Sequence, residues 1–214
     1  LREGGNVLSK KSEILSNNSE AVEQVLKKLA RKGIKVNWSR VSKDLGVGTT
    51  AAVRRTTKFL KIRKVRTHGR IKRIKILHRI NKRAGKLFNT GAYQQATYGK
   101  EASGIAPTEI IALRAMAADA VSSRSSGQCA TTCIWTVLGK ENDPLIRIVT
   151  DQVKSWIDLI QDQDLVKTSK AWWDIKAKFY GSPTPWATIK GPTGAIIGTL
   201  DYIGWKPISP LKWV

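Results

Sequence analysis

The chain has 214 residues, 41% of them hydrophobic and eight of them tryptophan, and its formal charge is +22. This composition excludes a disordered or collagen-like chain, and it allows one sizeable core or two small ones. No apolar run reaches the ~20 residues of a membrane span, no signal peptide opens the chain, and two cysteines make no disulfide scaffold. We therefore expect an intracellular protein, nuclear or cytoplasmic, that has no membrane partner.

The charge divides the chain into two parts. Residues 1–100 carry 26 Lys and Arg against 5 Asp and Glu, whereas residues 101–214 carry 12 against 11. Seven of the eight tryptophans follow residue 130. We predict a basic, nucleic-acid-binding region over 1–100 and a near-neutral helical scaffold domain over 101–214, with the boundary near 99–107.

The first 100 residues predict helices and one short strand. Ser19 is a candidate N-cap of a helix that ends before Gly33, with acidic residues in its first turn and basic residues in its last. Alternating apolar and polar residues over 34–38 favour a short strand. A basic helix is expected over 50–60 after a glycine turn, and another from Arg70 onward. The apolar stripe of this last helix is Ile71, Ile74, Leu77, Ile80, Ala84 and Leu87.

The second half is expected to be mostly helical. Asp143 followed by Pro144 is a strong signal for the start of a helix. One face of that helix carries Leu145, Ile148, Val149, Val153, Trp156, Ile157 and Ile160. Further helices are expected over 108–121 and 168–180 and from Pro192 to Gly204, and residues 129–138 are apolar enough to be buried. The predicted fold class is mainly α: a basic helical half with a short strand, followed by a Trp-rich helical domain.

We predict that the tryptophans of the second half belong to a core rather than to a ligand cage. Trp156 shares a stripe with aliphatic residues, so helical spacing explains it without a ligand. Trp172 and Trp173 are about 100° apart on a helix and cannot both face one core centre. One of them is expected to pack inward and the other against a segment such as that of Trp186 or Trp205.

No active site is legible in the sequence. Cys129 and Cys133 are four residues apart, but both histidines lie in the basic half, and two thiols do not complete a structural zinc site. We interpret the two cysteines as small buried hydrophobes. Asp158, Asp162 and Asp164 are interpreted as a solvated face rather than as a carboxylate site for two metal ions. Glycine motifs that bind dinucleotides or phosphates do not occur.

The strongest signal is a segment of fifteen bases between residues 54 and 86, without an acid between Asp44 and Glu101. Such a density of like charge indicates a polyanionic partner, because a merely soluble surface mixes both signs. Aromatic residues are sparse in this segment, which favours contact with the backbone of a duplex over base stacking on single strands. The expected nucleic-acid-binding residues are Arg54, Arg55, Lys58, Arg63, Lys64, Arg66, Arg70, Lys72, Arg73, Lys75, Arg79, Lys82 and Arg83.

Two alternatives share these features. Residues 38–45, the turn Gly46-Val47-Gly48 and residues 49–60 have the shape of a helix–turn–helix DNA-binding module that exposes Arg54 and Arg55. The same pattern fits an ordinary helical corner, or a strand and turn before a helix. A structural RNA-binding protein of a ribonucleoprotein, such as a ribosomal component, also has a strongly basic charge.

Several short motifs, taken in their order, resemble one family. Asp44-Leu45-Gly46-Val47 and Tyr98-Gly99-Lys100-Glu101 flank the basic stretch. The chain in this respect resembles the part of LINE-like (non-LTR) retroelement reverse transcriptases, of dinoflagellate or protist type, that follows the catalytic aspartates: the end of the palm, the thumb and a downstream segment. The other matching segments are Leu8-Ser9-Lys10-Lys11-Ser12, Trp172-Trp173, Gly191-Pro192-x-Gly194-Ala195 and Leu200-x-x-x-Gly204-Trp205-x-Pro207-x-Ser209-Pro210.

The resemblance implies a helical thumb that grips a template–primer duplex of RNA, DNA or both. The Tyr-x-Asp-Asp turn of the family is missing, so the chain alone is expected to be inactive and to need no cofactor; Mg²⁺ belongs to the palm. That palm would lie upstream of Leu1, in a polymerase segment of the same polyprotein, and the chain would be a C-terminal fragment or a relic. Lys11 (or Lys10) would match a lysine near the incoming nucleotide that donates a proton to pyrophosphate, or it is an exposed lysine before a helix.

Overall fold

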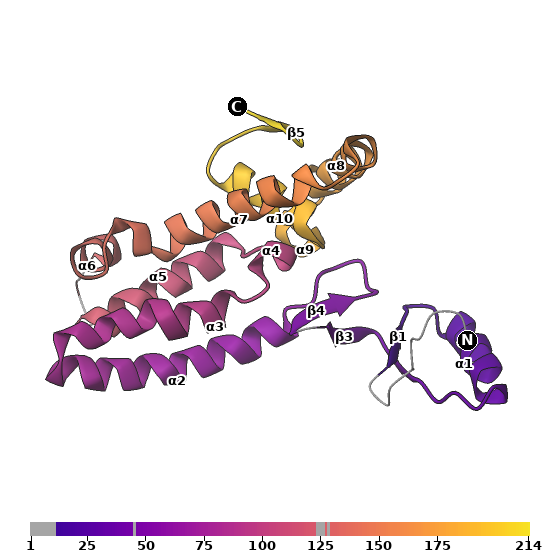
Figure 1. The fold of residues 1–214 in the computed structure, drawn as a ribbon, viewed down its shortest axis with the longest axis horizontal. Coiled ribbons are helices and arrows are strands. Elements are labelled where there is room, and N and C mark those ends of the chain that lie inside the picture. Colours follow the sequence, from indigo (N-terminus) through magenta and orange to yellow (C-terminus); the bar gives the residue numbers. More distant parts are fainter. Residues whose placement is uncertain (1–11, 45, 123–126, 128) are drawn as a thin grey trace.

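The computed structural model describes residues 12–44, 46–122, 127 and 129–214. The chain is mainly helical with a few short strands, which confirms the predicted fold class. Figure 1 shows a small N-terminal part beside a larger helical body. The elements of the N-terminal part are β1 (Glu13–Leu15), α1 (Ser19–Arg31), β2 (Asn37–Ser39), β3 (Val41–Asp44) and β4 (Val47–Thr50). The body contains α2 (Lys58–Ile80), η1 (Lys82–Lys86), η2 (Phe88–Ala92), α3 (Tyr93–Thr97), α4 (Lys100–Ser103), α5 (Pro107–Val121), α6 (Ala130–Val137), η3 (Lys140–Asn142), α7 (Pro144–Gln161), α8 (Leu165–Tyr180), α9 (Pro185–Thr188), α10 (Pro192–Tyr202), β5 (Pro207–Ser209) and β6 (Lys212–Trp213).

In the N-terminal part, α1 connects two parallel strands. β1 pairs with β2 in parallel, with Ile14 opposite Trp38. Asn18, rather than the predicted Ser19, caps α1: its side-chain oxygen accepts a hydrogen bond from the backbone N–H of Ala21 at 3.1 Å. Val22 is the buried residue of α1. The helix thus contributes little to a core, and Figure 1 shows it at the end of the molecule away from the helical body.

The segment 38–57 differs from the predicted helices. β3 and β4 form an antiparallel hairpin, with Val41 opposite Thr50, where the helix–turn–helix motif requires its first helix. Bends follow over 51–54, and helix formation starts only at Lys58. β-Branched residues at half of the strand positions, and Gly46 with a φ of 88° in the turn, favour a hairpin.

A first core joins the basic helix to the second half of the chain. Ile71 and Ile74 of α2 lie in one cluster with Phe88 and Tyr93, with residues of α5 and α6, and with Ile148 of α7. The predicted boundary at 99–107 therefore runs through a shared core. The predicted stripe of α2 is correct for its first two members only, because the helix ends at Ile80, and Leu77 and Ile80 are exposed to 47% and 84%.

A second core holds the tryptophans. Trp156 of α7 and Trp172 of α8 are buried with their ring centroids 5.5 Å apart, and Trp156 Nε1 donates a hydrogen bond to the carbonyl oxygen of Pro210. α10 packs against both helices. The prediction for Trp156 is confirmed. Of the adjacent pair, Trp172 faces inward, whereas Trp173 is 53% exposed beneath the ammonium of Lys176, instead of packing on another tryptophan.

Three local details of the second half bear on the predictions. Asp143 caps α7 as expected, accepting from the N–H of Leu145. The buried stripe of this helix repeats every fourth residue and includes Gln152, whereas the predicted Ile157 is exposed. Cys129 is exposed and Cys133 half-buried; the interpretation of Cys129 as a buried hydrophobe was wrong, because it precedes the first turn of α6 and points out of the core.

Candidate nucleic-acid interface

Helix α2 turns one narrow face toward the body of the protein. Thr67, Ile71, Ile74 and His78 are its buried residues, and spacings of three and four residues place them on one side of a helix. This side packs on α5. Because no acid occurs from residue 45 to residue 100, the remaining circumference presents basic side chains without counter-charges of its own segment.

Ten of the thirteen predicted nucleic-acid-binding residues are exposed. Nine of them lie along α2 or in η1 directly after it, and Figure 1 shows α2 as one straight helix along the edge of the body. Lys61, which lies within the basic segment but outside the predicted set, is exposed as well. The ten residues are Arg54, Lys58, Lys64, Arg66, Arg70, Lys72, Arg73, Arg79, Lys82 and Arg83.

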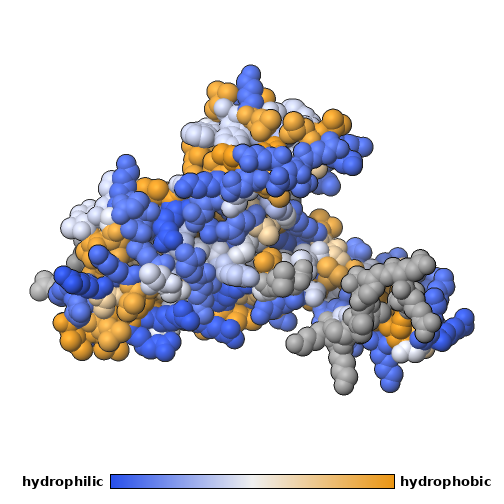
Figure 2. Space-filling view, viewed as in Figure 1, coloured by the Kyte–Doolittle hydropathy of each residue, from blue (hydrophilic) through white to orange (hydrophobic). Residues whose placement is uncertain are grey.

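The exposed cations of α2 form two rows. At about 100° per residue, Lys61, Lys72 and Arg79 lie along one edge of the solvent-facing side, and Arg66, Arg70 and Arg73 along the other. Between the rows runs an apolar strip of Ile62, Val65, Ile76 and Ile80, which are 42% to 84% exposed. Figure 2 shows hydrophilic atoms over most of this side, with apolar atoms at the C-terminal end of α2. We call these rows and the strip the α2 surface.

The other three predicted residues have partners inside the protein. Arg55 donates hydrogen bonds to the carbonyl oxygens of Ser103 and Gly104 at 2.9 and 3.1 Å and pairs with Glu109 at 3.3 Å. Lys75 is paired with Asp119 of α5. Their positive charges are compensated locally, so they hold α2 and the segment before it against the body.

Arg63, the third predicted residue with an internal partner, connects the two short motifs that flank the basic stretch, one with Gly46 and the other with Tyr98. Its guanidinium donates to the carbonyl oxygens of Gly46 and Tyr98 and lies 4.9 Å from the centroid of the Tyr98 ring. The two motifs touch closely: Gly99 has a φ of 75°, and a Cβ atom there would lie 2.7 Å from a methyl carbon of Val47. The glycines of both motifs thus permit a close approach of the hairpin to the start of α4.

A cavity of about 180 Å³ opens between α2 and α5, beside the Lys61 edge of the α2 surface. Sequence reasoning missed it, since its walls come from α2, α3, α5 and the turn before α5. No spacing pattern in the sequence connects these segments. The lining residues are Thr57, Leu60, Lys61, Lys64, Ala96, Ile105, Glu109, Leu113 and Met116.

The part of the chain that the structure describes offers little support for a site of another kind. Lys11 and Lys10 lie outside the described residues. Within those residues, no three His, Cys, Asp or Glu side chains are grouped as metal ligands, and no helix has the length and apolarity to cross a membrane. Comparison of the chain with protein-family models, curated proteins and solved structures gave no match.

Proposed function

We propose that this chain binds nucleic-acid duplexes through the α2 surface, as the thumb and downstream segment of a retroelement reverse transcriptase. The observation that carries the proposal is the set of exposed cations along α2 and η1 in a stretch of 56 residues without an acid. Each phosphate that such a cation neutralises releases counterions, and this release supplies much of the binding free energy whatever the base sequence.

A duplex suits this surface better than a single strand. The two cation rows flank a strip that is apolar but contains no aromatic ring, and stacking on aromatic rings is what stabilises single-stranded bases on a protein. Two rows on a straight helix match two phosphate strands that run side by side. Contacts of this kind fix the position of a duplex and carry little sequence information.

The proposal leaves polymerisation to other residues. The sequence holds no Tyr-x-Asp-Asp motif, and we assign no chemical step to this chain. Its second half, with a charge close to zero, would serve as the scaffold that holds α2 straight. The buried side chains of α2 in the first core support this role.

Fluorescence anisotropy tests the proposal. The purified chain is titrated into labelled DNA duplex, RNA duplex, RNA–DNA hybrid and single strands of the same sequence, at two salt concentrations. We expect tight binding to duplexes, weaker binding to single strands, and similar affinities after the base sequence is permuted. Binding that is restricted to one base sequence would instead indicate a sequence-reading module, and co-purification with ribosomes a structural component of a ribonucleoprotein.

A further inference from the structure

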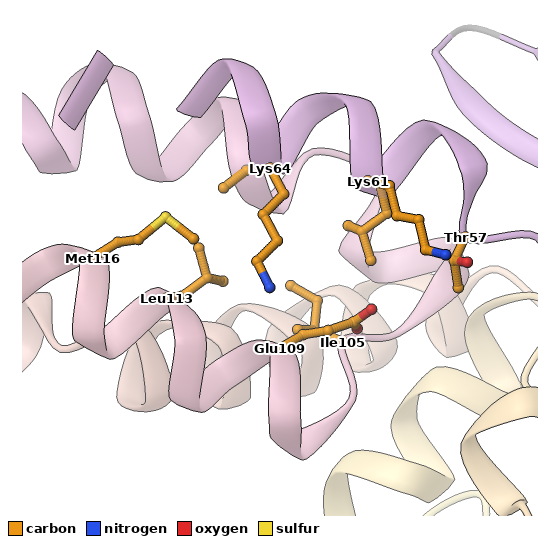
Figure 3. A pocket seen from close by; sticks show the side chains of 9 residues that line it. Thr57, Lys61, Lys64, Ile105, Glu109, Leu113 and Met116 are labelled. Atoms are coloured by element: carbon orange, nitrogen blue, oxygen red, sulfur yellow. The ribbon is translucent and has the colours of Figure 1, made fainter. Parts of the chain in front are cut away.

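The cavity between α2 and α5 has an apolar interior and polar groups at its mouth. Leu60, Ala96, Ile105, Leu113 and Met116 supply aliphatic walls. In Figure 3, Leu113 and Met116 lie toward one end, Thr57 and Lys61 lie at the other, and Lys64 reaches across from α2 toward α5. The volume of about 180 Å³ equals the share of roughly six waters in the liquid. It is below the ~300–1,000 Å³ of sites for drug-sized ligands, so the cavity admits one small ring system.

Glu109 makes this cavity chemically selective. Its Oε2 accepts hydrogen bonds from the N–H of Ala106 at 2.8 Å and from Arg55 at 3.3 Å. Its Oε1 accepts none from the residues that the structure describes, although the side chain is only 22% exposed. A ligand that enters therefore gains by offering an N–H donor to Oε1, and an apolar ligand would remove this oxygen from water without a partner.

Whereas Glu109 favours a hydrogen-bond donor, the positive charges at the mouth of the cavity favour an anion. Lys61 and Lys64 line the rim, and both are exposed. Lys61 also belongs to one cation row of the α2 surface, so a phosphate chain that follows this row passes the mouth of the cavity. The occupant must thus be largely apolar, carry an N–H donor for Glu109, and be attached to an anion outside. A fatty acid fails this condition, because its chain has no donor.

We propose that the cavity receives a single unpaired nucleobase, turned out of the nucleic acid that lies along α2. The inference rests on the proposed function and adds a site to it. Enzymes that act on extruded bases hold them in the same way, between apolar side chains and with hydrogen bonds to the base edge. Here the site would recognise a bulged or frayed nucleotide at the protein surface, with Lys61 and Lys64 on the adjacent phosphates.

The carboxylate also predicts which bases enter. Guanine, adenine and cytosine carry exocyclic amino groups that donate to Glu109 Oε1, whereas uracil and thymine present carbonyl oxygens around their single ring N–H. A carboxylate repels those oxygens. Because a well-placed base contact discriminates by ~1–3 kcal/mol, we expect a bulged guanosine to bind about tenfold more tightly than a bulged uridine.

The test compares three hairpin duplexes of one sequence: fully paired, with one bulged guanosine, and with one bulged uridine. Affinities are measured by anisotropy for the wild type and for Ala96→Met, which fills the cavity. Ala115→Met on the exposed side of α5 is the matched control. We expect the bulged guanosine to bind about tenfold more tightly than the other two, and we expect Ala96→Met alone to abolish this advantage while the fully paired duplex binds as before.

A second variant keeps the inference falsifiable if Ala96→Met does not fold. Glu109→Gln retains an amide oxygen that can accept from Ala106 and Arg55 but removes the negative charge. It should reduce the preference for guanosine over uridine to less than about threefold.

As a direct probe, 2-aminopurine at the bulge should brighten on binding, because the cavity walls contain no aromatic ring to quench it. Equal affinities of the wild type for the three hairpins, or a preference that survives both variants, would overturn the inference. Failure to bind even the fully paired hairpin would instead refute the proposed function.

Discussion

Neutralising the exposed cations of α2 should change the salt dependence of duplex binding by a calculable amount. Lys58 and Arg79 are 21 residues apart, so the helix spans about 32 Å between them. A B-form duplex presents about one phosphate charge per 1.7 Å of its axis, which gives more than enough phosphates for six contacts. Replacement of six exposed residues by Gln, with a slope of about 0.9 per phosphate, should flatten the plot of log affinity against log salt by about five units. The six are Lys58, Arg66, Arg70, Lys72, Arg73 and Arg79.

The control separates exposed charges from paired ones. Arg55→Gln and Arg63→Gln each remove one positive charge as well, but these guanidinium groups donate to backbone carbonyls inside the protein. Each should leave the slope within about one unit of the wild type and lower the melting temperature. Anisotropy at salt concentrations from about 50 to 200 mM, where six to ten phosphate contacts cost ~10³–10⁵ in affinity, gives the slope. A slope that the six replacements leave unchanged would refute the assignment of the α2 surface.

Three further outcomes are expected. Trp156→Ala removes a buried aromatic side chain and should cost about 3–5 kcal/mol in the free energy of unfolding, measured with denaturant, with little change in duplex affinity; an unchanged melting temperature with about tenfold weaker binding would place Trp156 in the interface instead. Gly99→Ala forces a positive φ on alanine and brings its Cβ against Val47, so it should destabilise the fold by about 1–3 kcal/mol; no loss would mean that the hairpin does not rest there. Hydrogen bonds from the backbone N–H of Thr132 are the largest cause that lowers the pKa of the exposed Cys129 to about 7. Its alkylation rate should therefore rise through pH 7 and level off above it, and a rate that still climbs near pH 9 would contradict this.

The predictions from sequence succeeded where the signal is local. Asp143 and Pro144 fix the start of α7 because both act on the first turn of their own helix. At residues 38–60 the sequence fits both a helix–turn–helix and a strand and turn before a helix, and the contacts that hold the turn of the β3–β4 hairpin come from Arg63 and Tyr98, 17 residues or more away in sequence. Charge composition placed a boundary at 99–107, but composition carries no information on packing, and the apolar face of α2 is buried against helices beyond that boundary.

The candidate site was predictable in its charge and not in its geometry. The density of bases identifies α2, but it does not distinguish Arg66, which is exposed, from Arg63 or Lys75, which are paired inside the protein. That distinction depends on the direction of each side chain around the helix and on acids such as Asp119 from another segment. The cavity beside Glu109 is likewise a product of tertiary structure.

The acid-free stretch gives salt two opposite effects. Arg66 and Arg70 are neighbours on α2, and like charges four residues apart destabilise a helix by a few tenths of a kcal/mol each. In the free protein this repulsion opposes folding, and dissolved ions relieve it by screening. The same ions compete with a duplex for the cations. Moderate salt should therefore raise the melting temperature of the free chain while it dissociates the complex, and at low ionic strength the bound polyanion takes over the role of a structural counter-ion, linking folding to binding.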